Sequence, residues 1–170
     1  MKHVYIARHA EAAPIGLNGV THDFDRPLTE HGQSLLLQQA SGLKQMNVFF
    51  QACYSSPLLR AQQTAEALCA LEDDCPVETV DCLGSIPQLS QVGKLLHANP
   101  AKHILLVTHQ PFVVELTSWL LSGEFESAFH YSTASISCLR MHLFEPKPRA
   151  ELMWFLTANQ MAALASQPGT

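Results

Sequence analysis

The stretch HVYIARHAEA, residues 3–12, decides how the rest of the chain is interpreted. Residues 4–7 form a short apolar run that is typical of a strand in the middle of a sheet. Arg8 and His9 follow at the carboxyl end of that run. In open α/β sheets the ligand crevice lies just beyond the carboxyl ends of the strands. A histidine there can act as a base, a metal ligand or a nucleophile, and an arginine can hold an oxyanion through a bidentate contact.

The bulk composition indicates one folded domain. The chain has 170 residues, of which 47% are hydrophobic and 15% charged, so it can bury a substantial core. We expect a single domain over residues 1–165 and a frayed tail over 166–170. The net charge is −5, and ten Lys and Arg residues are thinly spread, which excludes a basic stripe for nucleic acid. An anion site in such a chain must be local.

The sequence predicts neither a membrane segment nor a signal peptide. Arg8 and His9 interrupt the first apolar run, and the most apolar later segment, residues 111–121, contains Glu115. The chain has an odd number of cysteines and no Cys-x-x-Cys pair, which fits poorly with a disulfide framework or structural zinc. We therefore expect free thiols in a reducing cytoplasm. The five cysteines are Cys53, Cys69, Cys75, Cys82 and Cys138.

The apolar spacing predicts strands that alternate with helices. Thr29 can cap a helix whose inner face holds Leu36, Ala40 and Leu43. Ser56 and Pro57 are expected to open another helix as N-cap and first residue. Further helices are expected near 89–98, from about 111, and near the C-terminus; strands are expected at 52–54, 77–82 and 103–108, with an edge hairpin at 134–144 and 150–156.

This order predicts an α/β fold, a three-layer α/β/α sandwich with a mostly parallel central sheet and an edge hairpin. Two further polar residues then fall near Arg8 and His9. Arg60 lies in or just past the first turn of its helix, where a cation opposes the helix dipole. Either Arg60 points into solvent, or an anion sits between it and the helix start. His109 follows the apolar run HILLVT, as His9 follows the first strand.

These residues resemble the motifs of the histidine phosphatase superfamily, which has the phosphoglycerate mutase-like fold. Arg8-His9-Ala10 is similar to its Arg-His-Gly signature. The blocks at residues 27–32, 56–65 and 107–109 follow in the family's order, and residues 132–134 extend the likeness weakly. Within the superfamily, the compact length most resembles the SixA-type phosphohistidine phosphatases.

The resemblance implies roles for four residues. His9 resembles the nucleophile that takes the phosphoryl group, and Arg8, Arg60 and His109 resemble the rest of the phosphate pocket. A neutral imidazole is nucleophilic, and two guanidinium groups can stabilise the transferred charge without a metal or other cofactor. The implied substrate is phosphohistidine on a phosphotransfer or carrier protein. Phosphate, vanadate or tungstate would be pocket ligands.

Two departures from the family pattern matter for the substrate. Ala10 replaces a glycine, which we treat as minor. Relatives that cleave phosphomonoesters have a glutamate after the third strand, whereas residues 81–88 here contain none. Only 49 residues (109 minus 60) separate Arg60 from His109, which leaves no room for an inserted cap domain. Both features are typical of SixA-like proteins.

Several alternatives stay open at this point. Asp81 could be the acid of a general phosphomonoesterase or sugar-phosphate phosphatase, and the chain could be a non-catalytic module that binds phosphorylated partners. Glu11 and Asp25 are either loop charges or substrate contacts, and we favour loop charges. The remaining histidines have no ligand spacing on a shared element, so we expect no metal site among them. They are His3, His22, His31, His97, His103, His130 and His142.

Overall fold

Strands and helices alternate along most of the chain, as expected. The computed structural model describes residues 1–170 apart from 18, 71–74, 87, 126–128, 145 and 167–170, so most of the expected frayed tail lies outside the described residues. The strands are β1 (Lys2–Arg8), β2 (Ala52–Ser55), β3 (Val77–Thr79), β4 (His103–Thr108), β5 (Ile136–Leu143) and β6 (Arg149–Leu156). The helices are α1 (Glu30–Gln45), α2 (Leu59–Cys69), α3 (Leu89–Ala98), α4 (Phe112–Ser122) and α5 (Ala158–Ala165), with short 3-10 turns η1 (Asp23–Asp25) and η2 (Asp81–Leu83).

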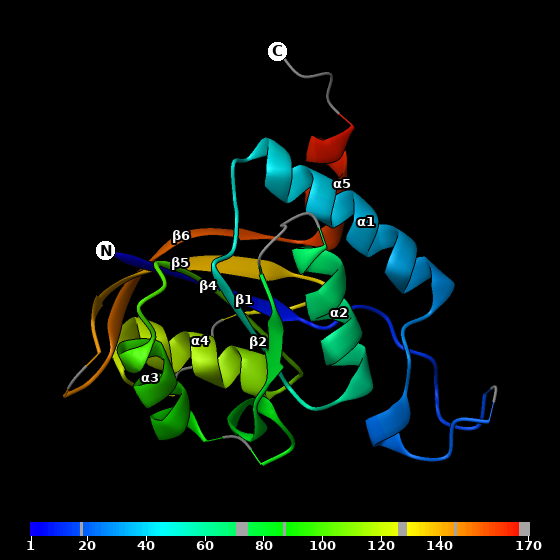
Figure 1. Ribbon diagram of the computed structural model, residues 1–170, viewed down its shortest axis with the longest axis horizontal. Helices are drawn as coiled ribbons and strands as arrows, with labels where there is room; N and C mark the ends of the chain where they lie inside the picture. The colour runs from blue at the N-terminus through cyan, green and yellow to red at the C-terminus, as the bar shows by residue number, and fades with distance from the viewer. Residues whose placement is uncertain (18, 71–74, 87, 126–128, 145, 167–170) are drawn as a thin grey trace.

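The six strands form one sheet in the order β3-β2-β4-β1-β5-β6. The first four strands are parallel, and β5 pairs antiparallel with both β1 and β6. The mostly parallel sheet with an edge hairpin is therefore confirmed. Figure 1 shows the sheet between two groups of helices, with α1, α2 and α5 on one side and α3 and α4 on the other.

Alternate side chains of each strand supply the two hydrophobic layers. On β1, Tyr5 and Ala7 pack toward α1, α2 and α5, whereas Val4 and Ile6 pack toward α3 and α4. Successive side chains of a strand point to opposite faces of the sheet. A central strand with helices on both faces must therefore be apolar on both faces. This explains why the decisive stretch is a continuous apolar run.

The start of α2 differs from the predicted one. We expected Ser56 as the cap, but the cap is Leu58 and the helix begins at Leu59. The Ser56 amide donates to the Val107 carbonyl (2.9 Å), so sheet pairing continues one residue past β2. The Leu58 amide donates to Ser56 Oγ at 3.4 Å. This hydrogen bond is like that of an N-cap, but the residues that it spans are not yet helical. The prediction was wrong because ladder pairing competes with local capping.

The third strand is shorter than predicted. We expected it over 77–82, but β3 ends at Thr79 and η2 follows. The Val80 amide still donates to the carbonyl of Ser55, and Ser55 is the last residue of β2. Beyond that point β3 has no neighbouring strand, so the chain turns and buries Leu83 in the core. Its carbonyl accepts a hydrogen bond from the Thr108 hydroxyl (2.8 Å).

Two sequence-level expectations concern the whole chain. In the part of the chain that the structure describes, no helix is long and apolar enough to cross a membrane. All five cysteines lie in described segments and are buried, and Sγ of Cys69 lies 3.5 Å from Sγ of Cys75.

The segment after His9 packs directly on the start of α1. Thr29 caps this helix as predicted, accepting from the Gly32 amide at 3.0 Å. The Thr29 amide donates to the Glu11 carbonyl (3.0 Å). A Cβ atom at Gly32 would lie 2.5 Å from that same carbonyl oxygen. Gly32 is therefore required because two backbone segments approach closely, and this contact holds the loop that carries His9.

We predict that Gly32→Ala lowers the free energy of unfolding by about 1–3 kcal/mol, the usual effect of overpacking. Alanine normally stabilises a helix interior relative to glycine by about 1 kcal/mol, so the clash must exceed that gain. Urea denaturation would measure the change. Ser34→Ala, at an exposed site on the same helix, is the matched control and should be neutral or slightly stabilising. Equal stability of Gly32→Ala and wild type would disprove the close-approach argument.

Candidate active site

Parallel pairing of β1 with β4 brings the two predicted histidines to one edge of the sheet. Ala7 lies beside Val107 and Arg8 beside Thr108 in the register. The pairing continues one residue further, because the His9 amide donates to the Thr108 carbonyl at 2.9 Å. His9 and His109 therefore leave the sheet together at its carboxyl end, where a ligand crevice is expected.

The His9 ring is fixed by two hydrogen bonds of opposite sense. Nδ1 lies 2.7 Å from the Ala10 carbonyl oxygen, which can only accept, so Nδ1 carries the proton. Nε2 lies 3.2 Å from Nε of Arg60, which can only donate, so Nε2 presents its lone pair. The neutral ring is thus held as one tautomer, with a nucleophilic nitrogen directed toward Arg60.

Burial keeps the His9 ring in this neutral form. Desolvation is the main cause that lowers its pKa, to about 4, and the positive charges of Arg60 and Arg8 lower it further, as does His109. The Ala10 hydrogen bond acts in the opposite direction. Only 8% of the side chain is exposed. The neighbouring residues that attract an anion therefore also keep this nitrogen unprotonated.

Arg60 has a carboxylate partner that we did not foresee. Its Nη2 lies 3.0 Å from a carboxylate oxygen of Asp23, and its Nη1 donates to the Asp23 carbonyl at 2.6 Å. Asp23 also pairs with Arg26 at 3.0 Å. Of the two alternatives that the sequence left open, exposure to solvent is wrong, since Arg60 is 5% exposed. The carboxylate that pairs with Arg60 in the structure is that of Asp23.

Arg8 is held from the opposite side. Its Nη1 donates to the Tyr131 carbonyl at 2.7 Å, and the Arg8 amide donates to the Ser135 carbonyl. Tyr131 is itself buried, with its hydroxyl hydrogen-bonded to Thr117 and Ser137. Burial lowers the pKa of Arg8, which remains a cation because arginine titrates far above neutral pH. The segment before β5, which resembled the family weakly in sequence, thus supports Arg8.

His109 lies at the end of β4, half-buried. Its Nδ1 is 3.3 Å from Oγ1 of Thr108, whose hydroxyl donates to the Leu83 carbonyl. Burial and the nearby Arg60 lower the pKa of His109, and Asp23 raises it. The structure therefore brings together all four predicted residues, Arg8, His9, Arg60 and His109, around one point.

Two blocks of the sequence signature hold this cluster in place. Thr64 Oγ1 accepts from the Ala10 amide (3.0 Å) and donates to the Arg60 carbonyl (2.7 Å), so it ties the His9 loop to α2. Gln63 Oε1 accepts from the Leu28 amide at 2.8 Å. Both residues belong to the block at residues 56–65, for which the sequence predicts no individual roles. Asp23 was missed altogether, because one exposed loop acid looks like any other in a sequence.

The other candidate acids lie outside the cluster of four. Glu11 accepts a hydrogen bond from the Thr29 hydroxyl (2.8 Å), and Asp25 is exposed in η1. Asp81 lines a hollow that faces α3, together with Lys94 and Leu95. Among the described residues, no group of three or more His, Cys, Asp or Glu side chains could hold a metal ion.

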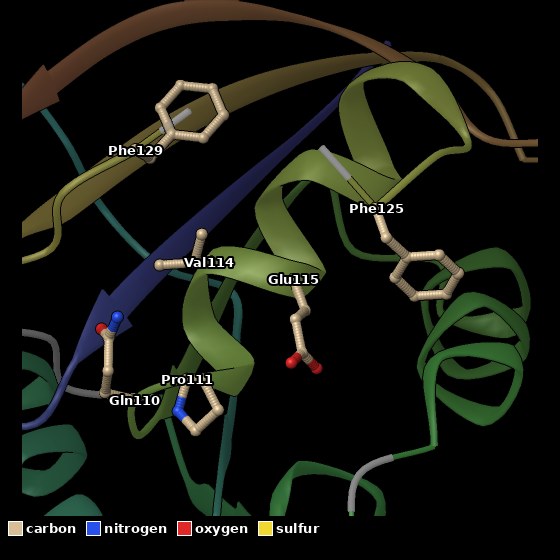
Figure 2. A pocket seen from close by; sticks show the side chains of 6 residues that line it. All are labelled: Gln110, Pro111, Val114, Glu115, Phe125 and Phe129. Atoms are coloured by element: carbon tan, nitrogen blue, oxygen red, sulfur yellow. The ribbon is translucent and has the colours of Figure 1, made fainter. Parts of the chain in front are cut away.

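A larger hollow begins next to His109. Its volume is about 730 Å³, and it runs along the exposed flank of α4. Figure 2 shows the Glu115 carboxylate pointing away from the helix into the space between Pro111 and Phe125. None of the four clustered residues lines it. The lining residues are Gln110, Pro111, Val114, Glu115, Phe125 and Phe129.

Comparison with known proteins identifies the family of the chain. The family model of the histidine phosphatase superfamily (branch 1) matches residues 4–86. An uncharacterized protein of Picosynechococcus sp. is 33% identical over 150 residues, which cover 81% of this chain and 84% of the relative. The protein histidine phosphatase SixA, solved with tungstate, is 26% identical with a TM-score of 0.80, over 92% of this chain and 97% of that one.

A more distant likeness concerns the fold alone. A phosphoserine phosphatase variant of Entamoeba histolytica, solved with phosphoserine, is 17% identical with a TM-score of 0.71. The likeness covers 94% of this chain and 99% of that one. The phosphoglycerate mutase-like architecture expected from the sequence is thus confirmed. The chain belongs to the histidine phosphatase superfamily.

Proposed function

We propose that this protein is a phosphatase that removes phosphate from phosphohistidine on a partner protein, through a phospho-His9 intermediate and without a metal. The observation that carries the proposal is the buried, neutral His9 ring with Nε2 directed at Arg60. A histidine that only fills the core has no reason to be held in one tautomer by a backbone carbonyl and a buried arginine. We also propose a reducing cytoplasm, because the chain has an odd number of cysteines and no Cys-x-x-Cys pair.

The proposed reaction has two displacements at phosphorus. Nε2 of His9 attacks, the bond from phosphorus to the partner's imidazole breaks, and solvent supplies a proton to the departing ring. Water then attacks phospho-His9 and releases inorganic phosphate. Arg8, Arg60 and His109 supply charge and hydrogen-bond donors for the phosphoryl oxygens, which is the main contribution that a protein makes to this chemistry.

The choice of phosphohistidine rests on the missing acid. Asp23 is the carboxylate nearest Arg60, and hydrogen bonds from Arg26 and Arg60 lower its pKa, so it is ionised and has no proton to donate. Asp81 lines the hollow beside α3, together with Lys94. An alkoxide leaving group has a conjugate acid near that of water, pKa about 15.7, and needs a positioned donor. The imidazole of phosphohistidine needs little help, because its reference pKa is about 6.5.

We predict that brief incubation with phosphoramidate gives a phosphoenzyme linked through Nε2 of His9. The Nδ1 proton donated to Ala10 leaves Nε2 as the only nucleophilic nitrogen of the ring. Phosphorus NMR of the denatured adduct would identify the isomer. His9→Ala should form none, whereas His31→Ala, which removes an exposed histidine on α1, should label as wild type does. Labelling of His9→Ala with full turnover would exclude the proposed intermediate.

We also predict a pH signature of the buried neutral ring. The folded pKa of His9 is about 4, below the unfolded value of about 6.5, so the unfolded chain binds more protons between these values. Stability therefore falls as pH falls through this window. Between pH 7 and pH 5 wild type should lose about 2 kcal/mol more than His9→Asn, which cannot titrate. Urea denaturation at both pH values would measure the loss of stability in each protein. An equal loss in wild type and His9→Asn would contradict the assigned protonation state.

The third prediction concerns substrate choice. A phosphohistidine protein should be cleaved at least ~100-fold faster, in kcat/KM, than an alkyl phosphate, because acid catalysis supplies about 10²–10⁴ in rate. Asp81→Asn should leave both rates unchanged within about twofold, as expected of a residue outside the site. If the alkyl ester is cleaved comparably and Asp81→Asn selectively removes that activity, Asp81 is the acid and the protein is a general phosphomonoesterase.

A further inference from the structure

Large apolar side chains are exposed on segments that flank the clustered residues. Phe24 is 50% exposed and directly follows Asp23, the partner of Arg60. Ile86 is 79% exposed and lies two residues after Gly84, where an added Cβ would lie 3.1 Å from the Pro57 ring. Figure 1 shows both segments at the lower edge of the view, on either side of the first turn of α2.

The hollow on α4 adds a further apolar surface, which begins at the residue after His109. It starts at Gln110 and Pro111, directly after that histidine, and Phe125 lines it with 66% of its surface exposed. The Glu115 carboxylate enters it from the helix (Figure 2). Substrate bound at His9 and extending over α4 would therefore meet an apolar wall with one negative charge.

Charge is distributed unevenly between the two ends of the sheet. All Lys, Arg and His residues lie in the described part of the chain, and among them none forms an ion pair with Glu11, Asp25 or Glu115. Near the site, the cations Arg8, Arg26 and Arg60 already contact protein oxygens. Lys94 lies on α3, and Lys147 pairs with Glu124, the residue before Phe125. The other cations lie near the opposite end of the sheet; they are Lys2, Lys44, Lys102, Arg140 and Arg149.

We propose that Phe24, Asp25, Ile86, Glu115 and Phe125 form a docking rim for the protein that carries the phosphohistidine. The proposal rests on the proposed function and deepens it. The partner surface that fits is one with apolar side chains among Lys and Arg around its phosphohistidine. A small phosphate has no use for three exposed apolar side chains, and the unpaired carboxylates repel it, whereas opposite charge would speed encounter with a basic surface.

The test compares one large and one small phosphoramidate substrate. The large one is a phosphotransfer domain phosphorylated on a histidine within a basic surface, and the small one is phosphoramidate itself. Phe24→Ser, Ile86→Ser and Phe125→Ser should each lower kcat/KM for the domain by roughly 5–30-fold, mostly through KM, as interface anchors do. Phosphoramidate turnover should stay within about twofold of wild type, because the same variants leave the four clustered residues intact.

Matched controls separate docking from a general loss of surface apolarity. Leu37→Ser and Leu164→Ser remove exposed leucines from α1 and α5, where the side chains are 67% and 38% exposed. Neither should change turnover of the domain. If they lower it as much as the rim variants do, the rim is not a docking surface.

A second arm tests the charge of the partner. Turnover of the domain by wild type should fall with ionic strength, and the double variant Asp25→Asn with Glu115→Gln should show a higher KM and a weaker salt dependence. A lower KM in this variant would mean that the rim repels its partner, which overturns the proposal.

The outcomes also distinguish the rim from the function. If wild type hydrolyses phosphoramidate but leaves the phosphorylated domain intact, the proposed function fails and the rim fails with it. If wild type dephosphorylates the domain and every rim variant does so with unchanged KM, the function stands and only the docking rim is rejected.

Discussion

The parallel pairing of β1 with β4 is the constraint on which the site depends. A histidine directly follows each strand, and the register that sets Arg8 beside Thr108 places His9 and His109 at one edge. A slip of one residue would turn the apolar side chains of β1 to the wrong faces. A slip of two would keep the faces but move His9 by about 6.6 Å along the sheet, beyond the reach of Arg60. The core therefore fixes the register, and the register fixes the site.

Repulsion between like charges would destabilise the cluster of four. Two arginines and two histidines near one point repel each other, and burial makes this worse. The protein offsets it with oxygen atoms: the Tyr131 carbonyl for Arg8, and the carbonyl and carboxylate of Asp23 for Arg60. Burial first, and then the charges of Arg60 and Arg8, lower the pKa of His9, so its ring is neutral and adds no further positive charge. The form that relieves the repulsion is the form that can attack phosphorus.

Much of the fold and the cluster of four could be predicted from the sequence, for identifiable reasons. Central strands with both faces buried give continuous apolar runs, and Thr29 is a strong cap, so β1, β4 and α1 were found where expected. The start of α2 was placed too early, because local capping rules do not include the bond from Ser56 to Val107. The third strand was predicted too long, because the length of an edge strand depends on its neighbour.

What the sequence could not supply were contacts between residues distant along the chain. Asp23 and Arg60 are 37 residues apart, and nothing in the sequence around Asp23 distinguishes it from Asp25. Tyr131 is 123 residues from Arg8, and its contribution is a backbone carbonyl, which carries no sequence signal at all. Such contacts arise only when loops from several strands meet at one edge of a sheet.

The short connection between Arg60 and His109 links the chemistry to the surroundings of the site. With 49 residues (109 minus 60) used by α2, β3, α3 and β4, none is left to build a cap over the pocket. A cap would enclose a small substrate and could carry the acid that an alkyl phosphate needs. We propose that, without an insertion in this connection, the site suits leaving groups that depart unaided and can accept a macromolecule. The short connection thus favours the P–N bond of a phosphohistidine as the bond that is cleaved, and a protein as the molecule that carries it.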